Sequence, residues 1–270
     1  MPSKISTHYF TAALKNSDIR LWIGSVGFFT LASRALAVVI GFQIYKITHS
    51  ALCLGWLGLV EAIPALSLVL IGGYVADHFN RRKILLITRG SSCICGLTLA
   101  ALSIQSYAHS LIGLYSVIFL VGIARGFADP ANTAFEAQVV PKAMTANASS
   151  WISSAWFGCS IIGAAIIGFV FDAWGAYGSY LLITGFFILS WVSTLAIGDK
   201  PQVMPEHKEP LLKSISMGWR FVLSQQPLWG GMTLDLIAVL FGGVIAILPI
   251  YASDILHAGA QGLGDRKSVV

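Results

Sequence analysis

The residues Gly72–Lys83, with the sequence GGYVADHFNRRK, separate two long apolar runs of this 270-residue chain. Within them a single acidic residue, Asp77, precedes three adjacent cations, Arg81, Arg82 and Lys83. Each flanking run is long enough to cross a bilayer, so we expect this turn to lie at a membrane surface. Lys and Arg are concentrated in the cytoplasmic loops of membrane proteins, and the three cations therefore predict that this surface is the cytoplasmic one.

The composition of the whole chain is that of a membrane protein. Hydrophobic residues make up 56% of it, the mean hydropathy is +0.77 and only 11% of residues are charged, whereas about a quarter of residues are charged in soluble globular proteins. The net charge of +5 does not indicate a nucleic-acid partner, because the basic residues fall in the short connections between apolar runs. We therefore expect the lipid bilayer as the surroundings of the chain and no nucleic acid as a partner.

Seven apolar runs each have the length of about 20 residues that a transmembrane helix needs. The sequence therefore predicts an all-α polytopic membrane protein. Residues 1–197 are expected to form a bundle of six transmembrane helices, and residues 227–264 the first transmembrane helix of an incomplete second bundle. The seven spans are expected near residues 21–45, 51–75, 84–105, 111–134, 148–171, 178–197 and 228–251.

Basic residues are distributed unevenly between alternate connections. Twelve Lys and Arg residues fall in the N-terminal segment and in the second, fourth and sixth connections with the helix ends that adjoin them. The connections on the other side contain Lys46 alone. This asymmetry predicts that the N-terminus is cytoplasmic.

The sixth connection, residues 198–226, differs from the others. It begins with a charged, Pro-rich segment at 199–210, and in residues 211–223 apolar side chains recur at helical spacing. We expect a cytoplasmic linker whose amphipathic helix lies along the membrane. The last six residues, 265–270, are a polar hexapeptide unlike the rest of the chain. A nucleotide string that resembles a sequencing adapter would encode them, so we expect them to be an artefact and the protein to continue after Gly264.

Four charged residues lie inside the predicted spans, where a charge at the helix centre costs about 2.5 to 3.5 kcal/mol. Arg34 and Glu61 lie about equally far from the tight turn between the first two spans, which places both roughly 16 to 18 Å below the outer surface. Two opposite charges at one depth can neutralise each other structurally, or one can bind a proton or substrate under the influence of the other. We take all four as candidates for a transport or proton-coupling site, with a structural buried pair as the alternative: Arg34, Glu61, Arg125 and Asp235.

Prolines and glycines mark places where the predicted helices bend or approach each other. Pro64 follows Glu61 by three residues and is expected to kink the second span. In the fourth span, Arg125 can pair with Asp129 on its own helix, as an alternative to a role beside Glu61. The glycines of the fifth span are expected to let helices pack closely, and the alternative is that they let helices slide at a moving interface. The remaining residues with an expected kink or packing role are Pro130, Gly158, Gly163 and Gly168.

The sequence offers no pattern for enzyme chemistry. It contains no Ser-His-Asp set, no phosphate-cradling glycine loop and no pair of catalytic carboxylates. Its four cysteines lie in apolar segments without neighbours at metal-ligand spacing. We expect no catalytic residue, no cofactor and no bound metal.

The pattern Gly73-x-x-x-Asp77-x-x-Asn80-Arg81-Arg82, between the second and third spans, resembles the signature loop of the major facilitator superfamily, usually written G-x-x-x-D-x-x-G-R-[RK]. Asn80 stands where the family has glycine, and we expect it to preserve the turn because Asn is the next best residue in left-handed backbone geometry. Likeness to the branch of enterobactin exporters and proton-linked drug exporters continues in Tyr45–Gly55, Glu61–Pro64, Arg125–Ala131 and Leu234–Pro249.

This resemblance implies a transporter of twelve spans in two halves, with the substrate at their interface. The chain would supply the first half, the linker and one span of the second half. It would export a small amphipathic molecule, drug-like or siderophore-like, across the inner membrane by alternating access, with protons as the coupling ion. The loop that contains Gly73, Asp77, Arg81 and Arg82 would be the gating latch. The antiporter motif of the fifth span is incomplete, because Gly163-Ala164 lacks its proline. The alternative is a non-transporting half-transporter or a membrane scaffold.

Overall fold

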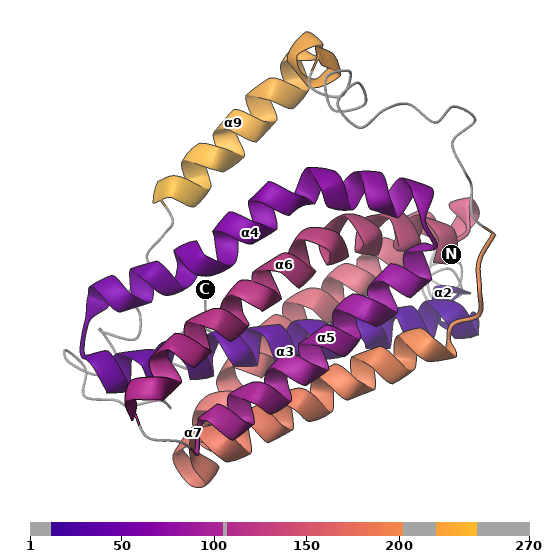
Figure 1. Cartoon of the computed structure of the whole chain (residues 1–270). Helices are drawn as coiled ribbons and strands as arrows, with labels where there is room; N and C mark the ends of the chain where they lie inside the picture. Colours follow the sequence, from indigo (N-terminus) through magenta and orange to yellow (C-terminus); the bar gives the residue numbers. More distant parts are fainter. Residues whose placement is uncertain (1–11, 105–106, 202–219, 242–270) are drawn as a thin grey trace, which may run out of the picture.

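The computed structural model describes residues 12–104, 107–201 and 220–241, and it contains only helices and short connections within these ranges. The expected all-α fold is confirmed for them (Figure 1). The predicted span ends near residues 105 and 251 and the suspected artefact at 265–270 lie outside the described residues. The helices are α2 (Ala12–Lys15), α3 (Ser17–Thr48), α4 (Ala51–His78), α5 (Arg81–Leu102), α6 (Tyr107–Val139), the 3-10 helix η1 (Lys142–Met144), α7 (Thr145–Ala196) and α9 (Gln226–Phe241).

Short polar residues set the boundaries of the first helices. Asn16 caps α3 by accepting a hydrogen bond from the backbone N–H of Asp18 at 2.9 Å, and α3 ends at His49, which has the left-handed φ of 47°. Asn80 caps α5 in the same way, since its side chain accepts from the N–H of Lys83 at 3.2 Å. Its φ of −63° and ψ of 111° are extended. Asn80 therefore preserves the turn as a helix cap, whereas the reason expected from the sequence, left-handed backbone geometry, was wrong.

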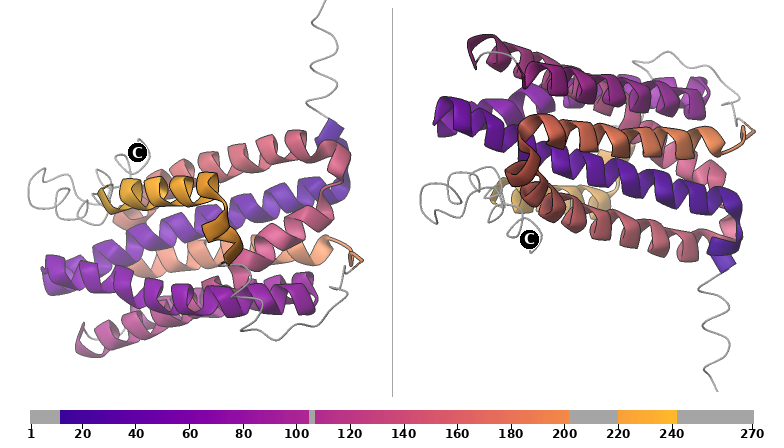
Figure 2. Two further views of the ribbon diagram at one scale, coloured as in Figure 1. Left: turned by 90° about the horizontal axis from the view of Figure 1, so that it is seen from above. Right: turned by 90° about the horizontal axis from the view of Figure 1, so that it is seen from below.

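The helix α7 contains two of the predicted spans, joined at Gly175. The backbone there has φ 66° and ψ −169°, a conformation that is essentially restricted to glycine. The chain turns back at this residue, and the two arms of α7 lie on either side of α3 in the views of Figure 2. Five stretches of the described chain are long and apolar enough to cross a membrane, and the last of them includes both arms of α7. The predicted spans at 148–171 and 178–197 correspond to these arms.

The helices pack in a fixed set of pairs. The most extensive contacts join α3 with α7, α4 with α6, and α5 with both α6 and α7. The larger of two buried clusters contains Val39 and Leu99, and the smaller one contains Trp22, Phe135 and Ile197. Since α4 packs mainly on α6, it lies at one side of the bundle (Figure 1).

One long side of α4 is apolar and uncovered in the described part of the chain. Leu52 and Leu66 are more than 70% exposed, and Ile63 and Leu70 more than 50%. Apolar side chains on a transmembrane helix face lipid or another span, and exposure of this kind is normal for both. The described residues of α9 are also mostly exposed, and α9 lies outside the bundle in Figure 1.

Candidate functional site

Three charged side chains from two helices meet in the apolar part of the bundle. Arg125 of α6 donates from Nη1 to Oε1 of Glu61 on α4 at 2.8 Å. Its Nε lies 3.4 Å from Oδ2 of Asp129, one turn further along α6. Both alternatives for Arg125 that the sequence offered, a partner on its own helix and a partner on α4, are therefore present together.

A close approach of α4 and α6 places Glu61 within reach of Arg125. A Cβ atom added to Gly122 would lie 2.4 Å from the carbonyl oxygen of Glu61 and 2.7 Å from Cγ of Pro64. Only glycine fits at this crossing without a shift of the backbone, and Arg125 follows Gly122 by three residues on the same side of α6. The proline and the glycine thus set the distance at which the ion pair forms. Although Pro64 and Pro130 lie inside them, α4 and α6 each continue as one helix.

Arg34 stands on α3 beside this group and has a different partner from the one expected. It makes no ion pair with a carboxylate of the described residues; its guanidinium carbon lies 5.3 Å from the ring centroid of Trp156 on α7. Glu61 and Arg125 are close enough to interact with it electrostatically. The depth argument therefore brought Arg34 and Glu61 into one neighbourhood, but the ion pair of Glu61 is with Arg125.

The group is open on one side. The side chains of Arg125, Asp129 and Glu61 are 58%, 57% and 33% exposed, and Arg34 is exposed as well. Charged side chains within transmembrane helices almost always face other helices or a water-filled cavity, because hydrocarbon does not solvate them. We call Arg34, Glu61, Arg125 and Asp129 the charged face, and its exposure indicates that it borders protein or water.

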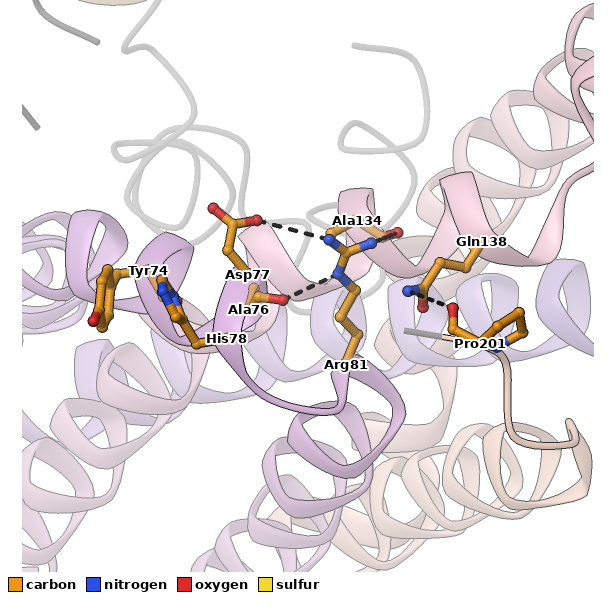
Figure 3. Close-up of polar contacts among 8 residues, drawn as sticks. All are labelled: Tyr74, Ala76, Asp77, His78, Arg81, Ala134, Gln138 and Pro201. Carbon is orange, nitrogen blue, oxygen red and sulfur yellow. Dashed lines mark hydrogen bonds and ion pairs between the residues drawn. The ribbon is translucent and has the colours of Figure 1, made fainter. Parts of the chain in front are cut away.

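The loop after α4 is held to its own bundle by Arg81 (Figure 3). Arg81 donates from Nε to the carbonyl oxygen of Ala76 at 3.0 Å and from Nη1 to that of Ala134 on α6 at 3.1 Å. Its Nη2 lies 3.7 Å from Oδ1 of Asp77, whose side chain remains 63% exposed. A Cβ at Gly73 would have no neighbour within 4 Å. Asp77 is thus the part of this loop that remains available to another partner.

Arg82 is directed to the end of α7. Its Nη1 donates to Oδ1 of Asp199 at 2.8 Å and its Nη2 to the carbonyl oxygen of Leu195 at 2.7 Å. The two arginines of the loop therefore bind α4, α6, the end of α7 and Asp199 after it, all within this bundle.

The other predicted site residues are not joined to the charged face. Asp235 is exposed on α9 and forms no ion pair with a described residue. Gly163 lies against α3, since a Cβ there would come within 2.6 Å of the carbonyl oxygen of Leu31. A Cβ at Gly158 would have nothing within 4 Å, and Gly168 is buried. In the described ranges, no three His, Cys, Asp or Glu residues come together as they would around a metal ion.

Sequence reasoning missed Arg89, which it counted with the cations at the cytoplasmic turn. Arg89 is 2% exposed inside α5 and contacts Ser25, Asn132 and Thr194. The available signal was its distance from the turn: eight residues after Arg81 correspond to about 12 Å along a helix.

Comparisons with known proteins show the family of this chain. The model of the family described as the Major Facilitator Superfamily matches residues 23–264. The enterobactin exporter EntS of Shigella flexneri is 26% identical over 228 residues, which are 84% of this chain and 53% of the exporter. The EntS of Escherichia coli O9:H4 (strain HS) is 27% identical over 201 residues, with 74% of this chain and 47% of the exporter covered.

Solved structures show the same fold. The crystal structure of the POT family transporter PepTSo has a TM-score of 0.61 at 16% identity, with 93% of this chain and 54% of that chain covered. A POT family transporter in complex with 5-aminolevulinic acid has a TM-score of 0.56. The chain spans about half the length of the relatives that it matches. With the family model matched over most of its length, the chain is a multi-pass membrane protein that belongs to the major facilitator superfamily.

Proposed function

We propose that this chain forms the N-terminal half of a secondary active transporter of the inner membrane, which exports a small amphipathic molecule by alternating access. Membership of the superfamily, the similarity to two exporters and a coverage of about half of each support this proposal. In this proposal residues 1–197 are one bundle, residues 198–226 are a cytoplasmic linker, and residues 227–264 begin the second bundle. The protein is a transporter and not an enzyme.

The observation that carries the proposal is the charged face. Arg125 has two carboxylates within reach, so Arg125, Glu61 and Asp129 together carry one negative charge, and the cation of Arg34 lies beside them. Binding of one proton removes the repulsion between the carboxylates and leaves one neutral ion pair. The group can therefore exist in two protonation states without isolating the arginine, which is what a proton-coupled step requires. We assign the proton to Glu61, because it lies on a different helix from Arg125 and its pairing joins α4 to α6.

Arg34 is proposed to contact the substrate. Its guanidinium is exposed, lies over an indole ring, and has no carboxylate within ion-pair distance among the described residues. Such a pair presents N–H donors next to an aromatic surface, which suits a substrate with an anionic or strongly polar group on an apolar frame. An amphipathic substrate has this character. Asp235 is kept as a candidate from the seventh span.

The cytoplasmic loop is proposed to act as the gate latch. Arg81 and Arg82 are bound within the bundle, whereas the Asp77 carboxylate is largely exposed. Asp77 would then bind the facing half in the outward-open state and release it on inward opening. This assignment places the N-terminus and the loop on the cytoplasmic side.

The second candidate function is a non-transporting half-transporter or membrane scaffold. Vesicle transport distinguishes the two. We would reconstitute the 270-residue chain, and a protein extended to the relatives' length by its own downstream coding sequence, and measure enterobactin movement driven by a pH gradient. Transport by the extended protein and none by the chain alone is the expected result. Without transport by either protein for enterobactin or a panel of amphipathic drugs, the scaffold reading would replace the proposal.

A further inference from the structure

Arg89 is a buried arginine without a carboxylate partner in the part of the chain that the structure describes. Its Nη1 contacts Oγ of Ser25 on α3 and Oγ1 of Thr194 on α7, and its Nη2 donates to Oδ1 of Asn132 on α6 at 3.2 Å. From α5, one side chain therefore reaches three other helices. Because a buried charge is costly, such a residue needs a role that a neutral residue cannot fill.

The shape of the guanidinium explains why the residue is arginine. Its planar fork directs several N–H groups to separate acceptors at once, whereas a lysine ammonium is a single point. The rings of Trp22 and Phe29, both on α3, lie 5.2 and 5.6 Å from the guanidinium carbon and supply their electron-rich faces. Side-chain oxygens and aromatic rings thus stabilise the charge of Arg89. Contacts with α3, α6 and α7 fix the position of its guanidinium.

The hydroxyl groups around Arg89 do not depend on it. Oγ of Ser25 donates to the carbonyl oxygen of Ser190 at 2.9 Å and lies 2.6 Å from Oγ1 of Thr194. Thr194 in turn donates to the carbonyl oxygen of Ser190 at 2.9 Å. These bonds alone join α3 to the second arm of α7. Satisfying buried hydroxyls is therefore not the reason for the arginine.

The residues that follow Thr194 are bound at several further points. Arg82 holds the carbonyl oxygen of Leu195 and the carboxylate of Asp199, and Ile197 is 0% exposed in the smaller core cluster. Lys200 pairs with Asp18 at the start of α3. Gln138 of α6 donates to the carbonyl oxygen of Pro201 at 3.5 Å, as Figure 3 shows. Residues 195–201, which we call the exit segment, are thus attached to α3, α5 and α6.

We infer that Arg89 is a positioning residue for the exit segment. By fixing Thr194 against α3 and α6 from inside the bundle, it sets the place from which Leu195, Ile197 and Asp199 reach their partners. Arg82 acts on the same segment from nearer the surface, so two arginines of α5 hold the end of α7. The exit segment then moves with the bundle as one body. This inference requires no transport activity and stands apart from the proposed function.

Hydrogen exchange of the backbone amides, followed by mass spectrometry on the 270-residue chain in lipid nanodiscs, tests the inference. Arg89→Met removes the fork and keeps an apolar side chain of similar length, and Thr194→Val removes one of its acceptors. We expect exchange in residues 195–199 to rise about tenfold in both variants, since loss of these contacts lowers the free energy of local opening. Exchange in α4 should not change. Arg20→Met, an exposed arginine near the same end of α3, is the control and should match the wild type.

Two results would overturn the inference. One is unchanged exchange in residues 195–199 in a folded Arg89→Met protein. The other is a uniform rise across all helices in both variants, which would make Arg89 a residue of general stability. Should Arg89→Met fail to fold, Arg89→Lys decides by the same criterion, because lysine keeps a cation at this position and loses the planar fork.

Discussion

At the scale of single residues, the contribution of an ion pair to the free energy of unfolding shows whether the charged face has a structural role. The pair of Arg125 and Glu61 is partly exposed, with side chains 58% and 33% accessible. Partly solvated ion pairs and polar contacts between transmembrane helices contribute about 1 kcal/mol or less. The ion pair of Arg125 and Glu61 therefore adds little to the stability of the bundle. A role in function explains these two charged residues better than a role in stability.

Replacing Arg125 by Met is therefore expected to change stability little and transport greatly. We expect the free energy of unfolding in detergent to fall by about 1 kcal/mol or less, while transport by the extended protein is lost because both carboxylates lose their counter-ion. Thermal unfolding and vesicle transport measure the two effects. A large loss of stability, with transport preserved in the folded fraction, would return Arg125 to the structural alternative.

At the scale of helices, Gly122 allows the close contact of α4 with α6, and Gly175 allows the turn between the two arms of α7. Substitution by alanine tests each role. Gly122→Ala places a Cβ against the backbone of Glu61 and the ring of Pro64, where there is no room. Overpacking of this kind costs typically about 1 to 3 kcal/mol, and the separation of α4 from α6 should also weaken the ion pair. Gly58→Ala on α4, where a Cβ meets nothing within 4 Å, is the matched control. Equal unfolding temperatures for the two variants would show that α4 and α6 do not touch at Gly122.

Gly175→Ala tests the turn between the two arms of α7. A Cβ there has free space, so any cost arises from the φ of 66°, and it should be about 1 to 3 kcal/mol. Gly185→Ala, which also has free space but lies inside the helix, should be neutral or stabilising by up to about 1 kcal/mol. Thermal unfolding of both variants in the same detergent compares them. A Gly175→Ala protein as stable as wild type would mean that the chain does not turn back through this conformation.

The sequence predicted the helices better than their partners. Runs of apolar residues gave the spans, because a bilayer fixes the length of a helix that crosses it. The neighbourhood of Arg34 and Glu61 followed from counting residues along a hairpin, but depth does not define the direction in which a side chain points. Pairing of Glu61 with Arg125 depends on the crossing at Gly122, and burial of Arg89 depends on hydroxyls from two other helices. The ion pair and the burial of Arg89 both result from the packing of several helices. The periodicity of apolar residues in one segment does not predict such packing.

At the scale of the whole molecule, the placement of the basic residues predicts a topology that fusions can test. A green fluorescent protein joined to the N-terminus or after Pro201 should fluoresce in the cytoplasm. Alkaline phosphatase joined after Ser50, between α3 and α4, should be active on the outer side. Activity of the phosphatase at the N-terminus, with none after Ser50, would reverse the orientation and with it the cytoplasmic assignment of the Asp77 loop.

The two halves of a major facilitator protein make sense of the exposed surfaces of this chain. The apolar side of α4, the charged face and the Asp77 carboxylate are all uncovered in the described residues. A second bundle would cover apolar surface and border the charged groups at the same time. The proposed second bundle therefore accounts both for the half-length coverage and for the exposure of the charged face.

The most direct test of the proposed function is proton-coupled transport by the Glu61→Gln variant of the extended protein in proteoliposomes. Glutamine keeps the size of the side chain and a hydrogen-bond acceptor for Arg125, but it cannot bind and release a proton. We predict that substrate export driven by a pH gradient is abolished, while exchange of substrate across the membrane without a gradient persists. Glu136→Gln, which changes a carboxylate on α6 outside the charged face, should leave both unchanged. Gradient-driven export at the wild-type rate in Glu61→Gln would contradict the assignment of Glu61 as the coupling group.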